Sequence, residues 1–554
     1  MNNNKYVIGV DYGTLSGRAL LVRVSDGLEV ASAVHEYSHA VIENSLPTNG
    51  KNLPPDWALQ VPSDYVDVLK QTIPAILRES EINPLDVIGI ATDFTACTVM
   101  PVTDEGTPLN ELPQFRDNPH AYVKLWKHHS AQSHADRIND LAHSRNESWI
   151  TRYGGKISSE WEFAKALQLF EESPETYETM RFWIEAADWI VWQLCGKYVR
   201  NICSAGFKGI YQEGQYPSPE FLRGLNPKFA NFVTEKLDQP IGELGSAAGF
   251  LTKRASQWTG LPEGIAVAVG NVDAHVTLAA ANAVNPGQMV AIMGTSTCHV
   301  MVSDKFAEVP GMCGVVQGGI ITGKIGYEAG QSGVGDIFAW FAENYISHKY
   351  HKKAKEQGID IQTYLSFLSL NQPVGSHGLI ALDWQSGNRS TLVDHKLSGL
   401  IIGLTLSTKP EEIYRALVES TAFGTRKILE TFNNSGIPVK EFIAAGGLIK
   451  NNFVMQIYSD VLNMPIKIIK SKQGPALGSA IHAAVAAGAY PDVVTAAAHM
   501  GGIESHKFTP IPENTRVYDQ LYDKYNSLYK EFGYSTIMHD LRRIRNFALM
   551  REKN

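Results

Sequence analysis

The sequence predicts an α/β protein built from two domains, and three observations support this. Its 554 residues exceed what one hydrophobic core usually serves. Strand-like apolar runs alternate with helix-like periodic segments along both halves. A glycine-containing hairpin pattern near the start recurs near the middle of the chain. We place the domains at residues 1–270 and 271–554, with a cleft between them as the natural place for a site.

Composition excludes several classes of function. The net charge is -8, and basic residues gather only in short clusters such as HKYHKK at 348–353. Since binding to phosphate backbones needs a concentrated cationic face, we expect no nucleic-acid partner. No apolar stretch approaches the roughly 18 residues that span a membrane, and Asp11 interrupts the first hydrophobic run. We therefore expect a cytoplasmic protein without a membrane partner. The five cysteines form no C-x-x-C pair, which favours reduced thiols over disulfides or a zinc site.

The elements of the first half follow from pattern. Residues 6–24 read as a β-hairpin, and residues 62–80 as a helix that Ser63 can cap. Residues 87–102 read as a second strand. Residues 159–195 read as helices separated at Pro174.

The second half repeats this alternation. Residues 265–284 read as a buried strand leading into a helix, and 289–303 as a second hairpin. Residues 442–469 read as strand, Gly446-Gly447 turn, helix and strand. The small residues of 474–488 predict a helix that packs very close to another element.

The two hairpins are the first candidates for a site. GVDYGTLSGR at 9–18 fits neither common nucleotide fingerprint, yet its Gly13-Thr14 aligns with Gly294-Thr295 of MGTSTC. Backbone N–H groups of a tight turn, the hydroxyls of Thr14, Ser16 and Thr295, and the guanidinium of Arg18 suit anionic oxygens. The alternative for each hairpin alone is a plain turn with a solvated arginine. Two such hairpins in one chain favour a phosphate clamp.

Two carboxylates are candidates for chemistry. Asp11 aligns with Ile292, so only the first hairpin carries an acid, which suits Mg²⁺ held through water. Asp273 follows an apolar strand in VAVGNVDAHV. In phosphoryl transfer such an acid accepts the hydroxyl proton, although an Asp there is also a common helix N-cap. One residue can do both.

Other motifs are less informative. GGIITGKI at 318–325 matches G-x-x-x-x-G-K, but Ile325 replaces the required hydroxyl and the flanks alternate like a hairpin, so we reject a P-loop. Lys208, Trp126 and Glu328 each have a plain structural alternative: a solvated turn, a core position and a helix cap, respectively.

Taken in order, these motifs resemble those of the FGGY carbohydrate kinases. GVDYGTLSGR is similar to that family's first phosphate motif, MGTSTC to its second, and AAGGLIKNN to its adenosine motif. The resemblance covers nearly the whole chain. It implies two ribonuclease-H-like domains, as in actin and hexokinase, that flank an ATP and sugar cleft.

Further blocks narrow the resemblance. LWKHHSA, SAGFKGIY, GNVDAHV, GYEAGQSGVGDIFAWF and the long HGLIALDWQSGNRSTLVD are most similar to members that act on L-ribulose. The resemblance implies transfer of the γ-phosphoryl of MgATP to the 5-hydroxyl of L-ribulose, as used in L-arabinose breakdown. Asp273 would be the general base; Ala96, Trp126, Lys208 and Glu328 would line the sugar pocket with it. Asp11 would serve the metal, and the nucleotide would be bound by Thr14, Ser16, Arg18, Gly294, Thr295, Gly446, Gly447 and Asn451.

Several points stay open. Leu15 stands where relatives commonly carry an acid, and Ala164 where they commonly carry proline. Another ketose or polyol, such as xylulose, is the alternative substrate, and an actin-like ATPase or chaperone is the remote alternative. The oligomeric state is undetermined, and a homodimer stays open.

Overall fold

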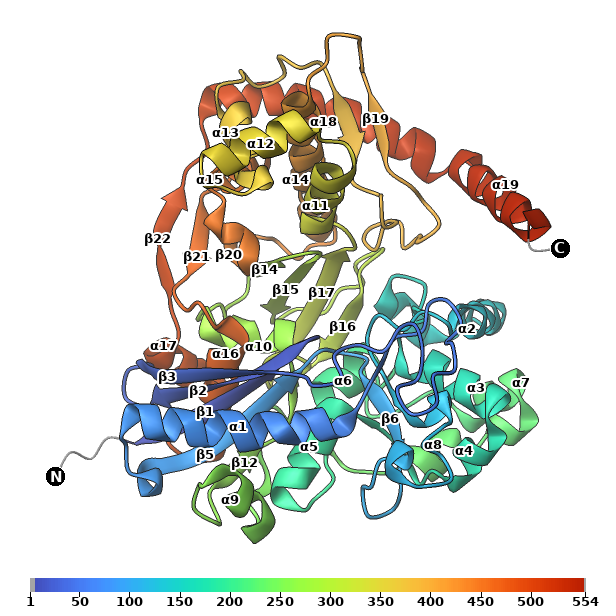
Figure 1. The fold of residues 1–554 in the computed structure, drawn as a ribbon, viewed down its shortest axis with the longest axis vertical. Coiled ribbons are helices and arrows are strands. Elements are labelled where there is room, and N and C mark those ends of the chain that lie inside the picture. The colour runs from blue at the N-terminus through green and yellow to red at the C-terminus, as the bar shows by residue number, and fades with distance from the viewer. Residues whose placement is uncertain (1–4, 553–554) are drawn as a thin grey trace.

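The computed structural model describes residues 5–552. Two lobes are stacked along the long axis, and each contains a seven-stranded mixed sheet. In Figure 1 the lower lobe holds the blue and teal N-terminal part of the chain, and the upper lobe holds most of the C-terminal part. The predicted two-domain α/β class is confirmed.

The first sheet has the strand order β11-β12-β5-β1-β2-β3, with β13 beside β5. β2 pairs antiparallel with both β1 and β3, whereas β5 pairs parallel to β1 and β12 parallel to β5. The strands are β1 (Tyr6–Tyr12), β2 (Ser16–Arg23), β3 (Glu29–Glu36), β5 (Val87–Phe94), β11 (Ala247–Phe250), β12 (Ala266–Ala268) and β13 (Asn271–Val272).

The second sheet repeats this pattern, with the order β16-β17-β15-β14-β20-β21-β22. β14, β15 and β17 are antiparallel in turn, and β20 and β21 follow β14 in parallel. β14 therefore corresponds to β1, and the predicted recurrence of the hairpin pattern reflects a duplicated topology. The strands are β14 (Gln288–Met293), β15 (Thr297–Ser303), β16 (Gly314–Gln317), β17 (Ile325–Gln331), β20 (Glu441–Ala445), β21 (Ile466–Ile469) and β22 (Ile503–Phe508).

Two small-residue helices lie between the sheets. α10 (Asp273–Ala280) contacts α16 (Gly474–Ala486), and α16 lies on β1 and β5 of the first sheet. A Cβ on Gly9 would lie only 1.8 Å from the carbonyl oxygen of Ala476, and one on Gly478 only 2.1 Å from that of Val276. The close packing predicted for 474–488 is confirmed, and it joins the lobes. α17 (Val493–Met500) packs against both α16 and α10.

A helical subdomain extends the N-terminal lobe. Its core is a four-stranded sheet of β4 (Leu59–Gln60), β7 (Val123–Lys124), β6 (Val99–Val102) and β8 (Phe182–Glu185). The helices of this lobe are α1 (Pro62–Ser80), α2 (Gln132–Arg145), α3 (Glu162–Glu172), α4 (Pro174–Thr179), α5 (Ala186–Cys195), α6 (Ile202–Phe207), α7 (Pro219–Leu225), α8 (Phe232–Lys236) and α9 (Lys253–Thr259). A short pair joins β9 (Arg200–Asn201) and β10 (Ile241–Gly242).

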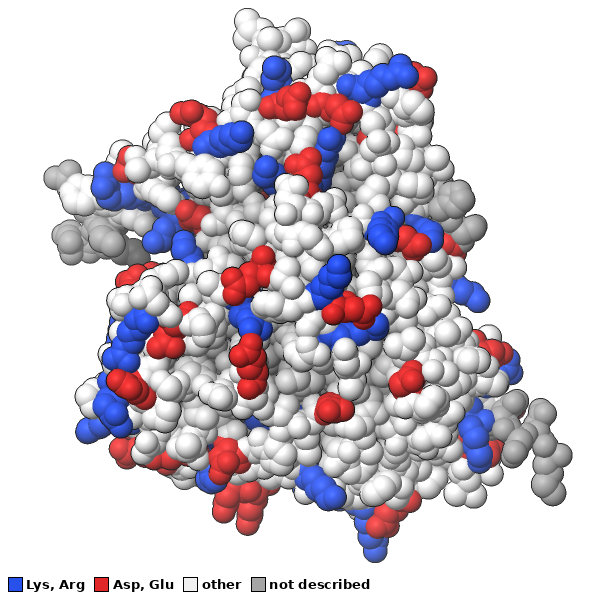
Figure 2. Space-filling model, turned by 180° about the vertical axis from the view of Figure 1, so that it is seen from behind, with Lys and Arg blue, Asp and Glu red and all other residues white. Residues whose placement is uncertain are grey.

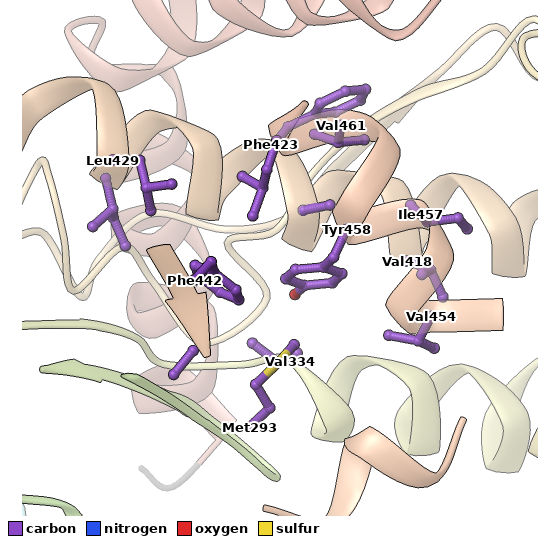
Figure 3. Packing of buried hydrophobic residues seen from close by; sticks show 14 of the residues in the cluster. Met293, Val334, Val418, Phe423, Leu429, Phe442, Val454, Ile457, Tyr458 and Val461 are labelled. Atoms are coloured by element: carbon purple, nitrogen blue, oxygen red, sulfur yellow. The ribbon is translucent and has the colours of Figure 1, made fainter. Parts of the chain in front are cut away.

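The C-terminal lobe is mainly helical outside its sheet. Its helices are α11 (Gly335–Asn344), α12 (His348–Glu356), α13 (Ile361–Leu370), α14 (Pro410–Asn434), α15 (Asn452–Leu462), α18 (Pro512–Gly533) and α19 (Ile537–Glu552), beside the pair β18 (Ile380–Leu382) and β19 (Leu400–Ile402). Figure 3 shows Met293, at the end of β14, next to Val334 and below Tyr458 and Phe442. The base of the second hairpin is thus anchored in this lobe's core.

Three local expectations were wrong. The helix at 62–80 begins at Pro62 with Val61 as N-cap, so Ser63 lies inside it. Residues 182–185 form strand β8 rather than helix, because they pair with β6. The run 87–102 is two strands in two different sheets.

The charged side chains of the surface are mixed in sign, and the helices are not of the membrane-spanning kind among the described residues. On the face shown in Figure 2, lysine and arginine side chains are interspersed with aspartate and glutamate. Among residues 5–552, every helix lacks the combination of length and apolar character that crossing a membrane needs.

Candidate active site

The first hairpin is fixed by bonds to its own lobe. Within its turn the Gly13 N–H donates to the carbonyl of Ser16 at 3.0 Å. The carbonyls of Gly13 and Thr14 accept from the Tyr37 hydroxyl at 2.9 Å and from the Gln60 amide at 2.8 Å. The turn's conformation is therefore imposed by the surrounding protein.

The second hairpin occupies the equivalent place in the other sheet and is held differently. Gly294 N–H donates to the carbonyl of Ser296 at 2.9 Å, which closes the turn. From the start of α11, the N–H groups of Val334 and Gly335 donate to the carbonyls of Thr295 and Gly294 at 2.8 and 3.0 Å. A Cβ on Gly335 would lie 2.6 Å from the Gly294 oxygen, so this approach requires glycine. Both hairpins are thus rigid, as a pre-formed anion site requires.

Acidic side chains meet at the carboxyl ends of the parallel strands in the first sheet. Asp11 of β1 is in register with Asp93 of β5, and Asp93 is in register with Asn271 of β13, two residues before Asp273. Burial raises the pKa of Asp11, while Arg18, whose Nε lies 3.3 Å from an Asp11 oxygen, acts in the opposite direction. The sheet therefore gathers carboxylates where the first hairpin begins.

Asp93 was not predicted as a site residue. It is fully buried, and the Ser479 hydroxyl of α16 donates to its Oδ2 at 2.6 Å. Burial, and then the neighbouring Asp11, raise the pKa of Asp93 well above its usual range. The available signal was an acid at the end of an apolar strand, GIATD, which parallels GVD in β1.

Asp273 is the first residue of α10, directly after β13. Its Oδ1 accepts the Ala274 N–H at 2.6 Å, and the helix N-cap is Val272 without a side-chain cap. The capping alternative is therefore wrong. Burial, and then the charge of Asp11, raise the pKa of Asp273 to about 7. A carboxylate with a pKa near the working pH suits proton transfer.

Lys208 and Glu328 form a buried ion pair between the lobes. Lys208 follows α6 and donates to both Glu328 oxygens at 2.8 Å, and Glu328 lies in β17 of the other lobe. His275 Nε2 lies 3.2 Å from Glu328 Oε2, and Arg389 donates to Oε1 at 2.9 Å. Burial alone would raise the pKa of Glu328, but Lys208, His275 and Arg389 hold it far below its usual range. Neither the solvated-turn alternative for Lys208 nor the helix-cap alternative for Glu328 holds.

Trp126 connects the expected sugar pocket to the first hairpin. Its indole N–H donates to the Thr14 hydroxyl at 3.1 Å, so it is not only a core residue. Ala96, in the loop after β5, packs between the core of the central helices and that of the helical subdomain. Trp161 lies under the Lys208 ammonium, 5.4 Å from its ring centre.

The glycine loop at 446–447 lies beside the second hairpin. It follows β20, whose neighbour is β14, and a Cβ on Gly446 would lie 2.5 Å from the carbonyl oxygen of Met293. A Cβ on Gly447 would meet nothing within 4 Å. Asn451 caps α15 by accepting the N–H groups of Phe453 and Val454. The loop therefore combines one tightly packed glycine with one open position.

A cavity of about 1090 Å³ lies between the lobes next to the ion pair. Its walls include Trp161 and Glu160 of the N-terminal lobe, and Cys313 and Arg389 of the C-terminal lobe. Its outer part lies between α2 and α19. Among residues 5–552, no group of three or more His, Cys, Asp or Glu side chains is arranged to hold a metal ion. A single strand-end carboxylate still fits Mg²⁺, which keeps several waters and binds substrate phosphates.

Family models and curated relatives match nearly the whole chain. The N-terminal domain of the FGGY family of carbohydrate kinases matches residues 6–280, and the C-terminal domain of that family matches residues 289–487. A ribulokinase of Mycolicibacterium smegmatis is 59% identical over 99% of this chain and 98% of its own length. A ribulokinase of Bacillus licheniformis is 52% identical over 96% of this chain and 98% of its own.

Solved structures share the fold. A xylulose kinase from Rhodospirillum rubrum superposes with a TM-score of 0.78 at 23% identity, covering 97% of this chain and 100% of the other. A gluconate kinase from Lactobacillus acidophilus gives a TM-score of 0.79 at 19% identity, covering 96% and 99%. With both domain families matched in order and relatives of high identity over nearly the full length, this chain is a carbohydrate kinase and belongs to the FGGY family.

Proposed function

We propose that this kinase transfers the γ-phosphoryl group of ATP to the 5-hydroxyl of L-ribulose and so makes L-ribulose 5-phosphate for the breakdown of L-arabinose. The observation that carries the proposal is the position of Asp273. Its pKa responds to Asp11 at the first hairpin and to Glu328 and Lys208 of the buried ion pair. A carboxylate between a phosphate-type loop and a sugar-type pocket is where an acceptor hydroxyl would meet a phosphoryl group. The names of the most similar relatives support L-ribulose as the sugar.

Proton removal is assigned to Asp273. Oδ1 already accepts the Ala274 N–H, which leaves Oδ2 for the 5-hydroxyl. As O5 attacks the γ-phosphorus, its proton passes to Asp273, the bond from that phosphorus to the β–γ bridging oxygen breaks, and ADP leaves with the electron pair. A positioned general base of this kind contributes roughly 10²- to 10⁴-fold in rate.

The nucleotide is assigned to the paired loops. Thr14, Ser16 and Arg18 of the first hairpin, and Gly294 and Thr295 of the second, would bind the phosphates. Gly446, Gly447 and Asn451 would hold the adenosine, since the open Gly447 leaves room beside the second hairpin. Donors fixed before the reaction stabilise developing charge without reorganisation.

Mg²⁺ is assigned to Asp11, where burial disfavours an uncompensated carboxylate. A bound Mg²⁺ would neutralise charge on the phosphate oxygens. The protein supplies the other functions: Asp11 orients the cation, Arg18 partly neutralises the Asp11 carboxylate, and the two lobes exclude water. Exclusion of water matters because water that enters an open cleft could attack ATP in place of the sugar hydroxyl.

Steady-state kinetics on the four 2-ketopentoses with MgATP test the proposal. We expect the highest kcat/KM on L-ribulose, and xylitol or glycerol serves as a polyol control. A preference for either xylulose enantiomer would overturn the substrate assignment and leave the kinase assignment intact. ATP hydrolysis that needs no sugar would instead favour an ATPase of the same fold.

A further inference from the structure

Arg389 is a half-buried cation with no part in the proposed phosphate clamp or in the proposed general base. It donates through Nη2 to Glu328 Oε1 at 2.9 Å, and its side chain is still 27% exposed. That exposed part faces the interlobe cavity. Its stem passes over Gly330 of β17, where an added Cβ would lie 3.0 Å from Arg389 Cδ. The guanidinium is thus fixed at one edge and open at the other.

Glu160 lies on the other wall of the same cavity. It belongs to the N-terminal lobe, next to Trp161, whereas Arg389 belongs to the C-terminal lobe. His129 Nδ1 is 3.8 Å from its Oε1, beyond hydrogen-bond distance. Burial alone would raise the pKa of Glu160, but Arg389, followed by His129, holds it below its usual value. Glu160 and Arg389 therefore line the same cavity from different lobes, one with a carboxylate acceptor and the other with a forked donor.

Glu328 links Arg389 to Asp273, the residue assigned to the reacting hydroxyl. Arg389 bonds the carboxylate that, with Lys208, influences Asp273. Both Glu328 oxygens are already occupied by Lys208, Arg389 and His275, so Glu328 itself has little capacity left for a sugar hydroxyl. Recognition at this place falls to the free donors of Lys208 and Arg389.

We propose that Arg389 and Glu160 form the outer end of the sugar site and recognise the 1-hydroxyl and 2-keto group of the substrate. Arg389 donates to O2 and O1, and the 1-hydroxyl donates to Glu160. This inference rests on the proposed function, because it takes Asp273 as the residue that meets the opposite end of the chain. A planar fork suits two adjacent oxygens, which a lysine cannot match.

The arrangement explains how a wide cavity selects a small sugar. A volume of about 1090 Å³ is at the upper end of small-molecule sites. Recognition groups carried by different lobes complete the site only where both reach the same ligand. A buried polar group left unpaired by a poor substrate gives stronger discrimination than shape alone.

The test compares Arg389→Met with the wild type on L-ribulose and on its 1-deoxy analogue. Because a hydrogen bond from a charged donor contributes about 1.5–3 kcal/mol, we expect roughly a 10- to 100-fold loss of kcat/KM on L-ribulose, mostly in the sugar KM. The KM for ATP should be unchanged. The wild type should disfavour the 1-deoxy sugar about tenfold or more, and Arg389→Met should lose most of that discrimination.

Further variants separate recognition from folding. Arg389→Lys keeps a cation next to Glu328 but lacks the fork, so it should fold and still lose discrimination. Glu160→Gln should also reduce discrimination against the 1-deoxy sugar. Lys396→Met removes a cation from the outer wall of the same cavity and should behave as the wild type. Titration calorimetry with L-ribulose in the absence of ATP reports binding independently of turnover.

The outcomes are distinguishable. If the wild type phosphorylates L-ribulose and Arg389→Lys retains full discrimination with unchanged sugar KM, the inference is overturned and the proposed function stands. If the wild type does not phosphorylate L-ribulose, the proposed function fails first. If Lys396→Met loses as much kcat/KM on L-ribulose as Arg389→Met does, the general charge of the cavity sets the affinity for the sugar. The inference about Arg389 is then overturned.

Discussion

Replacing Asp273 with asparagine tests the base and its environment together. The amide keeps an oxygen that can accept the Ala274 N–H, so local structure should survive, but it cannot accept a proton. We expect kcat to fall roughly 10²- to 10⁴-fold, equivalent to about 3–5.5 kcal/mol of barrier. Binding of ATP and sugar, measured by calorimetry, should change little.

The pH dependence follows from the raised pKa of Asp273. With a pKa of about 7, the carboxylate is mostly protonated at pH 6 and mostly ionised at pH 8. Since only the ionised form accepts a proton, kcat/KM of the wild type should rise about tenfold between these values. The residual activity of Asp273→Asn should lack this rise. A coupled ADP-release assay with saturating coupling enzymes at each pH measures both.

The same substitution should stabilise the protein at high pH. The folded state holds the Asp273 proton up to about pH 7, whereas an unfolded aspartate loses it near 3.8. Stability is therefore lost as pH rises between these values and stays low above them. Removing the ionisation returns up to about 4 kcal/mol at pH 8 and less at pH 5. The Tm of Asp273→Asn should exceed that of the wild type most clearly at pH 8.

These readouts together can refute the reasoning. A variant that is inactive because it is misfolded would show a lower Tm, not a higher one. If Asp273→Asn keeps kcat within tenfold of the wild type, Asp273 is not the base. If the wild-type activity profile is flat from pH 6 to 8, the burial argument for its pKa is wrong.

Three further predictions concern the metal, the packing and the buried ion pair. Asp11→Asn should raise the Mg²⁺ concentration for half-maximal rate and lower kcat, whereas an unchanged Mg²⁺ titration would remove Asp11 from the metal site. Gly9→Ala should unfold or strongly destabilise the protein, because its Cβ would overlap the Ala476 carbonyl. Gly447→Ala should keep the wild-type Tm and raise the ATP KM, because a Cβ there meets nothing within 4 Å. If the two variants have equal Tm values, the argument from close packing at Gly9 is refuted. Glu328→Gln should lower the free energy of unfolding by about 3–5 kcal/mol, because it leaves the Lys208 cation without its anion. Chemical denaturation measures this loss.

Much of the fold could be predicted because its signals are local. The hairpins, the strand leading into α10 and the small-residue helix α16 each follow from patterns of a few residues. β8 was missed because its apolar residues precede a helix and its pairing partner, β6, lies about 80 residues earlier in the chain. Strand pairing at that separation leaves little trace in periodicity.

Sequence motifs pointed to several of the residues that the structure brings together. Asp273, Lys208 and Glu328 stand in short blocks that resemble those of a family, and the structure brings the last two into contact. Arg389 and Glu160 were not identified, because their significance comes from a shared cavity between the lobes rather than from spacing along the chain. Burial in the interior of the fold cannot be read from neighbours in sequence.

The duplicated sheets differ in the residues that end their central parallel strands. In the first sheet the β1–β5 register places Asp11 beside Asp93; at the corresponding place in the second sheet, β14–β20, it places Ile292 beside Ala445. Arg18, the cross-strand partner of Asp11, is likewise replaced by Cys298. The same topology thus ends the paired strands β1 and β5 with carboxylates in one lobe, and ends β14 and β20 with apolar residues in the other, where β20 leads into Gly446. Under the proposed function, the difference at this one pair of register positions puts the metal and the proton acceptor in the N-terminal lobe and leaves the C-terminal strand ends to the adenosine.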